Sequence, residues 1–150
     1  MGRIKRLSPE REIAEGCLAT RLRLLNRVVT NLYDAALRPH GLRVSQMNIL
    51  VVIAVGGPLR AVDVARRMRL DASTLSRDLE RLLARKWVRS VPGPERARQL
   101  EATAVGRKLV AKVLPDWREA QRQARELLSS AAAETIVGAV DALWTADEAE

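Results

Sequence analysis

The apolar and polar positions of residues 62–83 alternate with the period of an α-helix, and one short turn interrupts them. Asp71 stands where the second helix should begin, and its carboxylate can accept a backbone N–H of the first helical turn. Leucines then recur at i, i+4, i+7 and i+8: Leu75, Leu79, Leu82 and Leu83. The pattern predicts two helices, of which the second docks on a core through a leucine face.

The opposite face of this second helix carries Ser73, Thr74, Arg77 and Arg81. Short donors near a helix N-terminus suit phosphates, and arginine suits O6 and N7 of guanine. The face therefore suggests a helix that contacts nucleic acid. The alternative is an ordinary amphipathic helix whose polar side is only solvated.

Two helices are expected before this pair. The first, over residues 18–38, has a long apolar stripe and is stopped by Pro39 and Gly41. The second, over residues 46–55 with Ser45 as its N-cap, is apolar nearly all round and should form the buried centre. Residues 56–58, Gly-Gly-Pro, end it, and residues 59–60 suggest a very short strand.

A β-hairpin is predicted after the helix pair. Residues 87–91 alternate as a strand, residues 92–95 form a turn, and residues 96–102 return as a second strand. Two helices followed by such a hairpin form a winged helix-turn-helix, with Arg96 and Arg98 at the tip of the wing. Basic side chains there can reach phosphates or the minor groove, although a merely solvated hairpin would also carry them.

Two further helices follow, the first over residues 104–128 with Thr103 as its cap, the second over residues 131–144. Pro115 should kink or locally break the first. Their apolar stripes are Leu109, Val113, Trp117, Ala120 and Ala124, then Ile136, Val140, Leu143 and Trp144. These apolar faces are expected to be buried by packing against one another and against a second copy of the chain. A two-fold dimer would place two recognition helices one DNA turn apart, ~34–36 Å.

Composition supports one domain over residues 1–150 that interacts with nucleic acid. Hydrophobic residues make up 47% of the chain, enough for a core, and the net charge is +8, mostly from arginine. A basic balance favours nucleic acid as a partner, unless the whole source proteome is rich in arginine. Aromatic residues make up only 3%, which argues against single-strand binding through base stacking.

The single cysteine, Cys17, excludes an intramolecular disulfide and favours a cytoplasmic location. No signal peptide is visible, and the longest apolar run, residues 49–55, is too short for a membrane span. The sole histidine, His40, is expected in an exposed loop. One histidine and one cysteine supply neither a metal site nor a catalytic triad, so we expect no metal, no cofactor and no enzymatic activity.

From about residue 17 to residue 143 the chain resembles the MarR family of bacterial transcriptional regulators. The matching segments, in order, are residues 42–46 (LRVSQ), 62–65 (VDVA), 70–77 (LDASTLSR), 87–88 (WV) and 102–106 (ATAVG). The resemblance implies a mainly α fold with a small β-hairpin. It divides the chain into a winged helix-turn-helix lobe, about residues 42–102, and dimerisation helices, about residues 10–40 and 103–146.

The resemblance further implies a homodimer that binds a palindromic operator in double-stranded DNA. Many members are repressors released by small aromatic or phenolic ligands, and some respond to cysteine oxidation. Carried over by position, the DNA-binding residues are Ser73, Thr74, Ser76, Arg77 and Arg81 on the recognition helix, and Arg96 and Arg98 on the wing. No effector-binding residue is assigned.

Three alternatives or departures accompany the resemblance. Lys86 stands where the family has a left-handed glycine, so either Lys86 adopts positive φ or the helix exits differently. Cys17 could make the protein a redox-sensing regulator, although it lacks the usual neighbouring tyrosines, and a buried structural cysteine is the simpler interpretation. Finally, the chain could be an interaction protein that keeps the winged fold without binding an operator.

Overall fold

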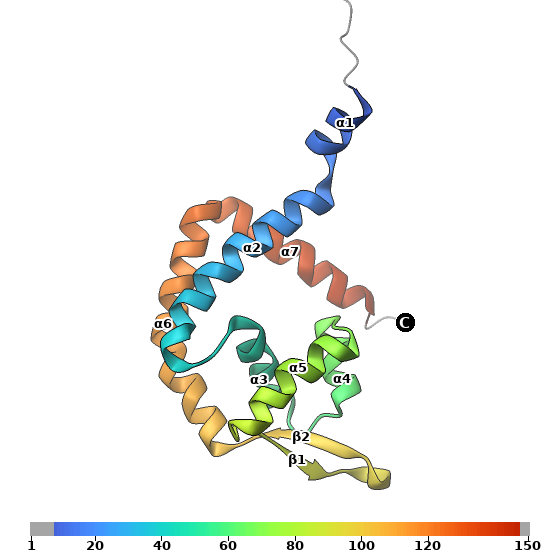
Figure 1. Cartoon of the computed structure of the whole chain (residues 1–150), viewed down its shortest axis with the longest axis vertical. Helices are drawn as coiled ribbons and strands as arrows, with labels where there is room; N and C mark the ends of the chain where they lie inside the picture. Colours follow the sequence, from blue (N-terminus) through green and yellow to red (C-terminus); the bar gives the residue numbers. More distant parts are fainter. Residues whose placement is uncertain (1–7, 148–150) are drawn as a thin grey trace, which may run out of the picture.

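The computed structural model describes residues 8–147, and their side chains through residue 143. The described chain is mainly α-helical with one β-hairpin, as predicted (Figure 1). Its elements are α1 (Pro9–Gly16), α2 (Leu18–Leu37), η1 (Arg38–His40), α3 (Val44–Gly56), α4 (Ala61–Met68), α5 (Ala72–Ala84), β1 (Val88–Pro92), η2 (Pro94–Arg96), β2 (Arg98–Ala102), α6 (Ala104–Leu128) and α7 (Ser130–Asp147). The side chain of Trp144, which the sequence placed on an apolar stripe, lies outside the described residues.

Helix α3 forms the centre of the core, as its nearly continuous apolar sequence predicted. Ile49, Leu50 and Ile53 are fully buried on it. The same cluster contains Leu75 and Leu82 of α5. It is completed by Leu37, Leu42, Met47, Leu59, Val64, Trp87, Val88, Leu100, Ala102 and Val113. The helix pair α4–α5 and the hairpin therefore pack on one shared apolar centre.

The leucine face of α5 is narrower than the sequence suggested. Leu75 and Leu82 are buried and Leu79 is half-buried, but the side chain of Leu83 is 37% exposed. The prediction that Leu83 belongs to the docking face is wrong. At about 100° per residue, Leu83 is rotated some 80° from Leu75, so it lies at the edge of the buried stripe.

Two of the three predicted helix caps are confirmed. The Asp71 side chain accepts a bond from the N–H of Thr74 (2.8 Å), and Thr103 Oγ1 accepts one from Gly106 N–H (3.0 Å). The cap at Ser45 is wrong, because α3 begins at Val44. There Asp34 Oδ1, from α2, accepts from the N–H of Val44 (2.8 Å), so a distant carboxylate takes the role expected of Ser45.

The hairpin pairs β1 with β2 in antiparallel register, from Val88 opposite Ala102 to Pro92 opposite Arg98. The expected second strand began at residue 96, but Arg96 lies in the turn η2 with φ of 62°. The short strand expected at residues 59–60 reduces to an isolated bridge between Leu59 and Leu100. Lys86 has φ of 57°, so the chain turns into β1 as if the family's glycine were present.

Helix α6 runs unbroken from Ala104 to Leu128 with Pro115 inside it, so the proline does not interrupt the helix. Figure 1 shows α6 as a curved rod that joins the hairpin at one end to α7 at the other. His40 is not the exposed loop residue that was expected. Its side chain is 12% exposed, and Nε2 lies 2.6 Å from Asp116 Oδ2 on α6.

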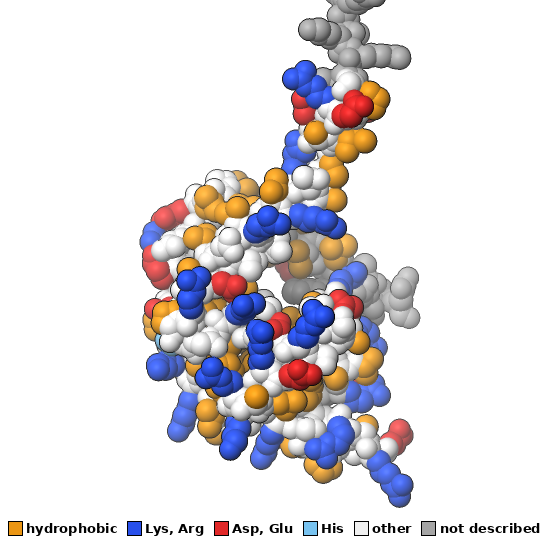
Figure 2. Space-filling model, viewed as in Figure 1, with side chains coloured by type: hydrophobic (Ala, Val, Ile, Leu, Met, Phe, Trp, Pro, Cys, Tyr) orange, Lys and Arg blue, Asp and Glu red, His pale blue; other side chains and the backbone are white. Residues whose placement is uncertain are grey.

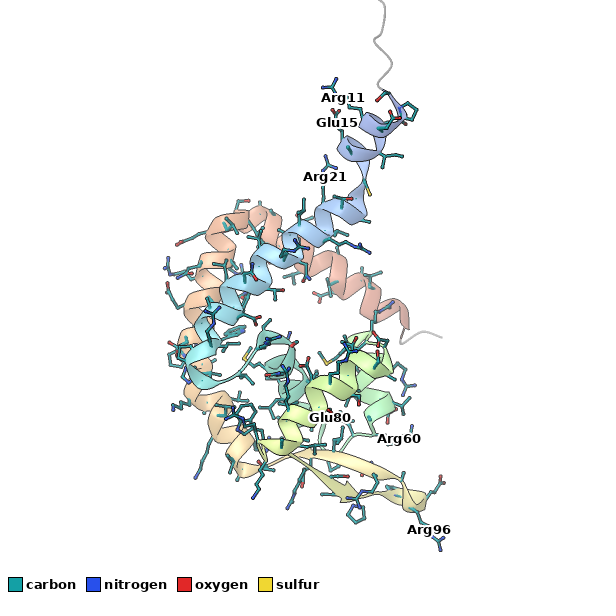
Figure 3. The ribbon with its side chains drawn as sticks, viewed as in Figure 1. Arg11, Glu15, Arg21, Arg60, Glu80 and Arg96 are labelled. Carbon is teal, nitrogen blue, oxygen red and sulfur yellow. The ribbon has the colours of Figure 1, made fainter. Side chains whose placement is uncertain are left out.

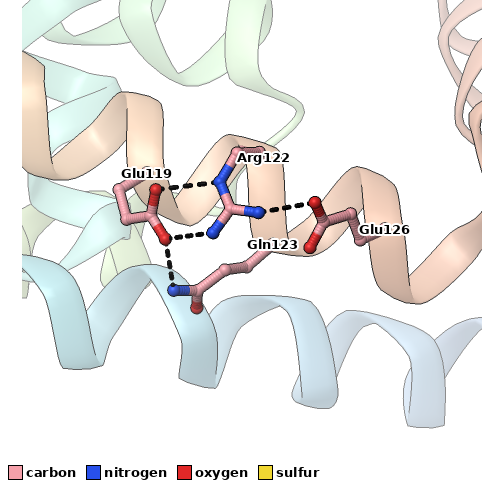
Figure 4. Close-up of polar contacts among 4 residues, drawn as sticks. All are labelled: Glu119, Arg122, Gln123 and Glu126. Atoms are coloured by element: carbon pink, nitrogen blue, oxygen red, sulfur yellow. Dashed lines mark hydrogen bonds and ion pairs between the residues drawn. The ribbon is translucent and has the colours of Figure 1, made fainter.

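A network of hydrogen bonds and ion pairs lies on the surface of α6 (Figure 4). Arg122 donates from Nε to Glu119 Oε2 (2.9 Å) and from Nη1 to Glu126 Oε1 (2.5 Å), and Gln123 Nε2 donates to Glu119 Oε1 (2.8 Å). The Arg122 guanidinium and then the Gln123 amide lower the pKa of Glu119 to about 2. Glu119 is therefore ionised and already partnered at neutral pH.

The terminal helices leave apolar side chains in solvent. Helix α1 and the first turns of α2 extend away from the rest of the chain (Figure 1). At least 37% of each of the following side chains is exposed: Ile13, Leu18, Leu22, Leu24, Ile136, Val137, Val140 and Leu143. Within the described residues, nothing covers these faces.

We expect Gly106→Ala to lower the free energy of unfolding by about 1–3 kcal/mol, because overpacking a tight contact forces the backbone apart. A Cβ on Gly106 would clash with the carbonyl oxygen of Trp87. Urea denaturation measures the change. Gly138→Ala is the matched control, because nothing lies within 4 Å of that Cβ and alanine should stabilise α7 by about 0.5–1 kcal/mol. Equal effects at the two positions would contradict the close packing of α6 on Trp87.

Candidate nucleic-acid interface

Helix α5 turns a polar face to solvent, because Leu75 and Leu82 hold its other side in the core. The predicted residues of this helix are all exposed: Ser73, Thr74, Ser76, Arg77 and Arg81. Lysine and arginine side chains gather over α5 and along the hairpin in Figure 2. The structure thus brings the predicted recognition-helix residues onto one accessible, basic surface.

The hydroxyl groups at the start of α5 bond to its N-cap. Ser73 Oγ donates to Asp71 Oδ1 (2.5 Å), and Thr74 Oγ1 donates to Asp71 Oδ2 (2.7 Å). The bonds from Ser73 and then Thr74 hold the pKa of Asp71 far below its usual range. The hydroxyl protons of both residues are thus occupied, and the adjacent Asp71 carboxylate would repel a phosphate.

Arg77 and Arg81 lie one helical turn apart on the exposed face of α5. Neither side chain makes an ion pair or a hydrogen bond with any residue in the described part of the chain. Their donors are therefore available to a partner. Ser76 is exposed beside Arg77 and offers a further hydroxyl.

The two wing arginines differ in position. Arg96 lies in the turn at the tip of the hairpin, and its side chain points away from the protein (Figure 3). Arg98 is not at the tip, as the sequence suggested, but on β2, where its Nε donates to Ser90 Oγ on β1 (2.8 Å). The cause is that β2 begins two residues later than expected. Arg98 therefore lies on the strand, where Ser90 accepts a hydrogen bond from its guanidinium.

A buried amide positions α5, and the sequence analysis missed it. Gln46 is 3% exposed; its Nε2 donates to Asp78 Oδ1 on α5 (3.1 Å), and its Oε1 accepts from the N–H of Arg43 (3.2 Å). One side chain thus caps the start of α3 and holds α5. The available signal was a glutamine in the first turn of a largely apolar helix.

Cys17 lies between α1 and α2 and is half-buried. A hydrogen bond with Thr20 is the main cause that lowers the pKa of its thiol. The only tyrosine, Tyr33, instead bonds to Gln121 on α6. Among the described residues, no cluster of three histidine, cysteine, aspartate or glutamate side chains is placed to hold a metal ion.

An open surface groove of about 590 Å³ lies between α2 and α6. It is lined by Val28, Leu32, Ala35 and Leu127 together with the polar residues Asn31, Gln123 and Glu126. The dimensions lie within the range of small-molecule sites. The lining is mostly aliphatic.

The two helices α4 and α5, the antiparallel hairpin after them and the central α3 define a winged helix-turn-helix. A family model described as the MarR family matches residues 40–99. A crystal structure of the M. tuberculosis transcriptional regulator MosR is 30% identical, covers 91% of this chain and 98% of its own, and superposes with a TM-score of 0.73. The chain belongs to the MarR family, whose members are transcription regulators.

Two further solved structures show the same fold. A probable transcriptional regulator from Pseudomonas aeruginosa is 26% identical, covering 87% of this chain and 98% of its own with a TM-score of 0.76. A mutant MarR from E. coli in complex with operator DNA is 18% identical, covering 88% and 96%, with a TM-score of 0.77. No curated protein sequence matches the chain. None of the helices in the described region is long and apolar enough to cross a membrane.

Gln46→Leu should lower the free energy of unfolding by about 1–3 kcal/mol, because it leaves the Arg43 N–H and the Asp78 carboxylate without a partner. Thermal and urea denaturation measure this effect. Asp78→Asn is the matched control, since an asparagine Oδ1 can still accept from Gln46. If Gln46→Leu is as stable as the wild type, the Gln46 amide does not position α5.

Proposed function

We propose that this protein is a sequence-specific regulator that binds double-stranded DNA, with α5 in the major groove and the hairpin beside it. The observation that carries the proposal is the pair of exposed, unpartnered guanidinium groups of Arg77 and Arg81, opposite the buried leucines of α5. Arginine reads guanine through two parallel hydrogen bonds. Arg96 at the tip of the hairpin is assigned to the flanking phosphates or minor groove, and Ser76 to a contact beside Arg77.

The assigned roles of the remaining residues follow their geometry. Ser73 and Thr74 are assigned to DNA as acceptors at the start of α5: Asp71 takes their hydroxyl protons, so their hydroxyl oxygens can accept only from amino groups on base edges. Arg98, held by Ser90, is assigned to the backbone on the side of the wing. Arg77 thus carries the guanine contact in this proposal, and Arg81 contacts the DNA one helical turn further along α5.

A homodimer on a palindromic operator is part of the proposal. The exposed apolar side chains of α1, α2 and α7 need a covering surface, and a second copy offers the same faces by two-fold symmetry. Two α5 helices would then enter successive major grooves on one side of the duplex. The E. coli relative solved with operator DNA has the same fold, which supports this arrangement.

We further propose that the protein is a repressor relieved by a small ligand. The mostly aliphatic groove between α2 and α6 supports this idea, because a ligand there would touch two helices of the proposed dimerisation region, one of which, α6, continues directly from the hairpin. An aromatic or phenolic compound fits its size and lining. Redox sensing through Cys17 is the second candidate, supported by the lowered pKa of its thiol.

Arg77→Ala should weaken operator binding by about 1–3 kcal/mol and relax the preference for one base pair, because alanine cannot make the bidentate hydrogen bonds. Fluorescence anisotropy measures binding to a sequence selected from a random DNA pool and to a scrambled duplex. Arg118→Ala is the control, because it removes one exposed charge from α6 instead of α5. Unchanged affinity and preference in the Arg77 variant would assign base readout to other residues. Absence of any sequence preference in the wild type would favour an interaction protein that does not bind an operator.

A further inference from the structure

A second basic feature lies beside the C-terminal half of α5. An open pocket of about 420 Å³ is lined by four arginines from three segments: Arg38 in η1, Arg43 before α3, and Arg81 and Arg85 on α5 and at its end. We call this feature the arginine hollow. No aspartate or glutamate lines it.

The four guanidinium groups lack a counter-charge. None of them forms an ion pair with a carboxylate in the described part of the chain, whereas Arg60, Arg89 and Arg122 elsewhere all do. Like charges around one hollow repel one another, and a low-dielectric wall strengthens their combined field. An anion in the hollow would remove this repulsion.

The backbone around the hollow accommodates the arginines. Gly41 has φ of 68°, and a Cβ there would lie 3.6 Å from Nη2 of Arg85. The Arg85 guanidinium lies 5.6 Å from the centre of the Trp87 ring. Since that ring is 8% exposed and Arg85 lies over it, the hollow offers guanidinium donors but no aromatic surface for stacking a ligand.

We propose that the arginine hollow binds a phosphate group, and that this phosphate belongs to the DNA strand flanking the groove that α5 enters. The inference rests on the function proposed above. Guanidinium groups match phosphate oxygens through paired hydrogen bonds. Arg81 and Arg85 follow Arg77 at one-turn intervals along α5, so the hollow adjoins the surface assigned to the bases. Backbone contacts of this kind set the register in which base contacts form.

Arg38 and Arg43 extend this contact to a second element. They precede α3, whose start is tied to α5 through Gln46 and Asp78. A phosphate between the two elements would therefore be bound by a rigid frame. Both side chains are exposed, and neither is assigned a base contact, so they can be changed without altering the recognition face of α5.

The double variant Arg38→Ala/Arg43→Ala tests the proposal. Its affinity for operator and for scrambled DNA should fall by the same factor, about tenfold or more, because a phosphate contact carries no sequence information. The slope of log affinity against log salt should become shallower by about 0.9 for each phosphate that the variant no longer neutralises. The Arg118→Ala variant should keep the wild-type slope, and circular dichroism checks that all variants are folded.

The outcomes separate this proposal from the proposed function. If the wild type prefers its operator and the double variant keeps its affinity and salt slope, the hollow does not contact DNA, and only this inference is overturned. If the wild type shows no sequence preference, the proposed function itself fails. Calorimetric titration of DNA-free protein with inorganic phosphate provides a further arm. Binding that the double variant abolishes, combined with an unchanged DNA salt slope, would assign the hollow to a free phosphate and overturn the DNA contact.

Discussion

The orientation of α5 depends on a short chain of polar contacts within an otherwise apolar core. Asp34 of α2 accepts the N–H of Val44, and Gln46 connects the N–H of Arg43 to Asp78 of α5. A buried polar side chain is costly unless its hydrogen bonds are made, so these contacts favour one arrangement of α3 and α5. Leucine packing alone would tolerate more than one rotation of α5, because apolar contacts are not directional.

Charge is distributed unevenly over the molecule. Acidic side chains on α4, the hairpin and α6 pair with arginines in Asp63–Arg60, Glu101–Arg89 and Glu119–Arg122 contacts. The arginines of the exposed face of α5 and of the arginine hollow have no such partners in the described chain. Exposed ion pairs add little to stability, but they do neutralise the surface locally. The unpaired groups therefore leave a concentrated positive field on the side of α5 and the hairpin (Figure 2).

The terminal helices pose a different physical problem. Ile13, Leu18 and Leu22 are exposed along α1 and the start of α2, and Val137, Val140 and Leu143 along α7. Several exposed large apolar side chains on neighbouring turns of a helix are typical of an interface. The lobe proposed to contact DNA has its apolar centre within one chain, while the helices that flank it leave apolar side chains exposed. This division separates the part assigned to DNA recognition from the part that would set the spacing of two copies.

Local signals in the sequence were sufficient for most of the fold. Asp71 and Thr103 cap their helices, and residues 56–58 end α3, because each acts on backbone groups a few residues away. The exposed face of α5 also followed from helical period alone, since its opposite side had to enter a core. Long-range contacts decided the rest. Asp34 of α2 accepts from the N–H of Val44, where α3 begins, and Ser90 of β1 accepts a hydrogen bond from Arg98. The arginine hollow was invisible in the sequence because Arg38 and Arg43 lie about 40 residues from Arg81 and Arg85, and only tertiary packing brings them together.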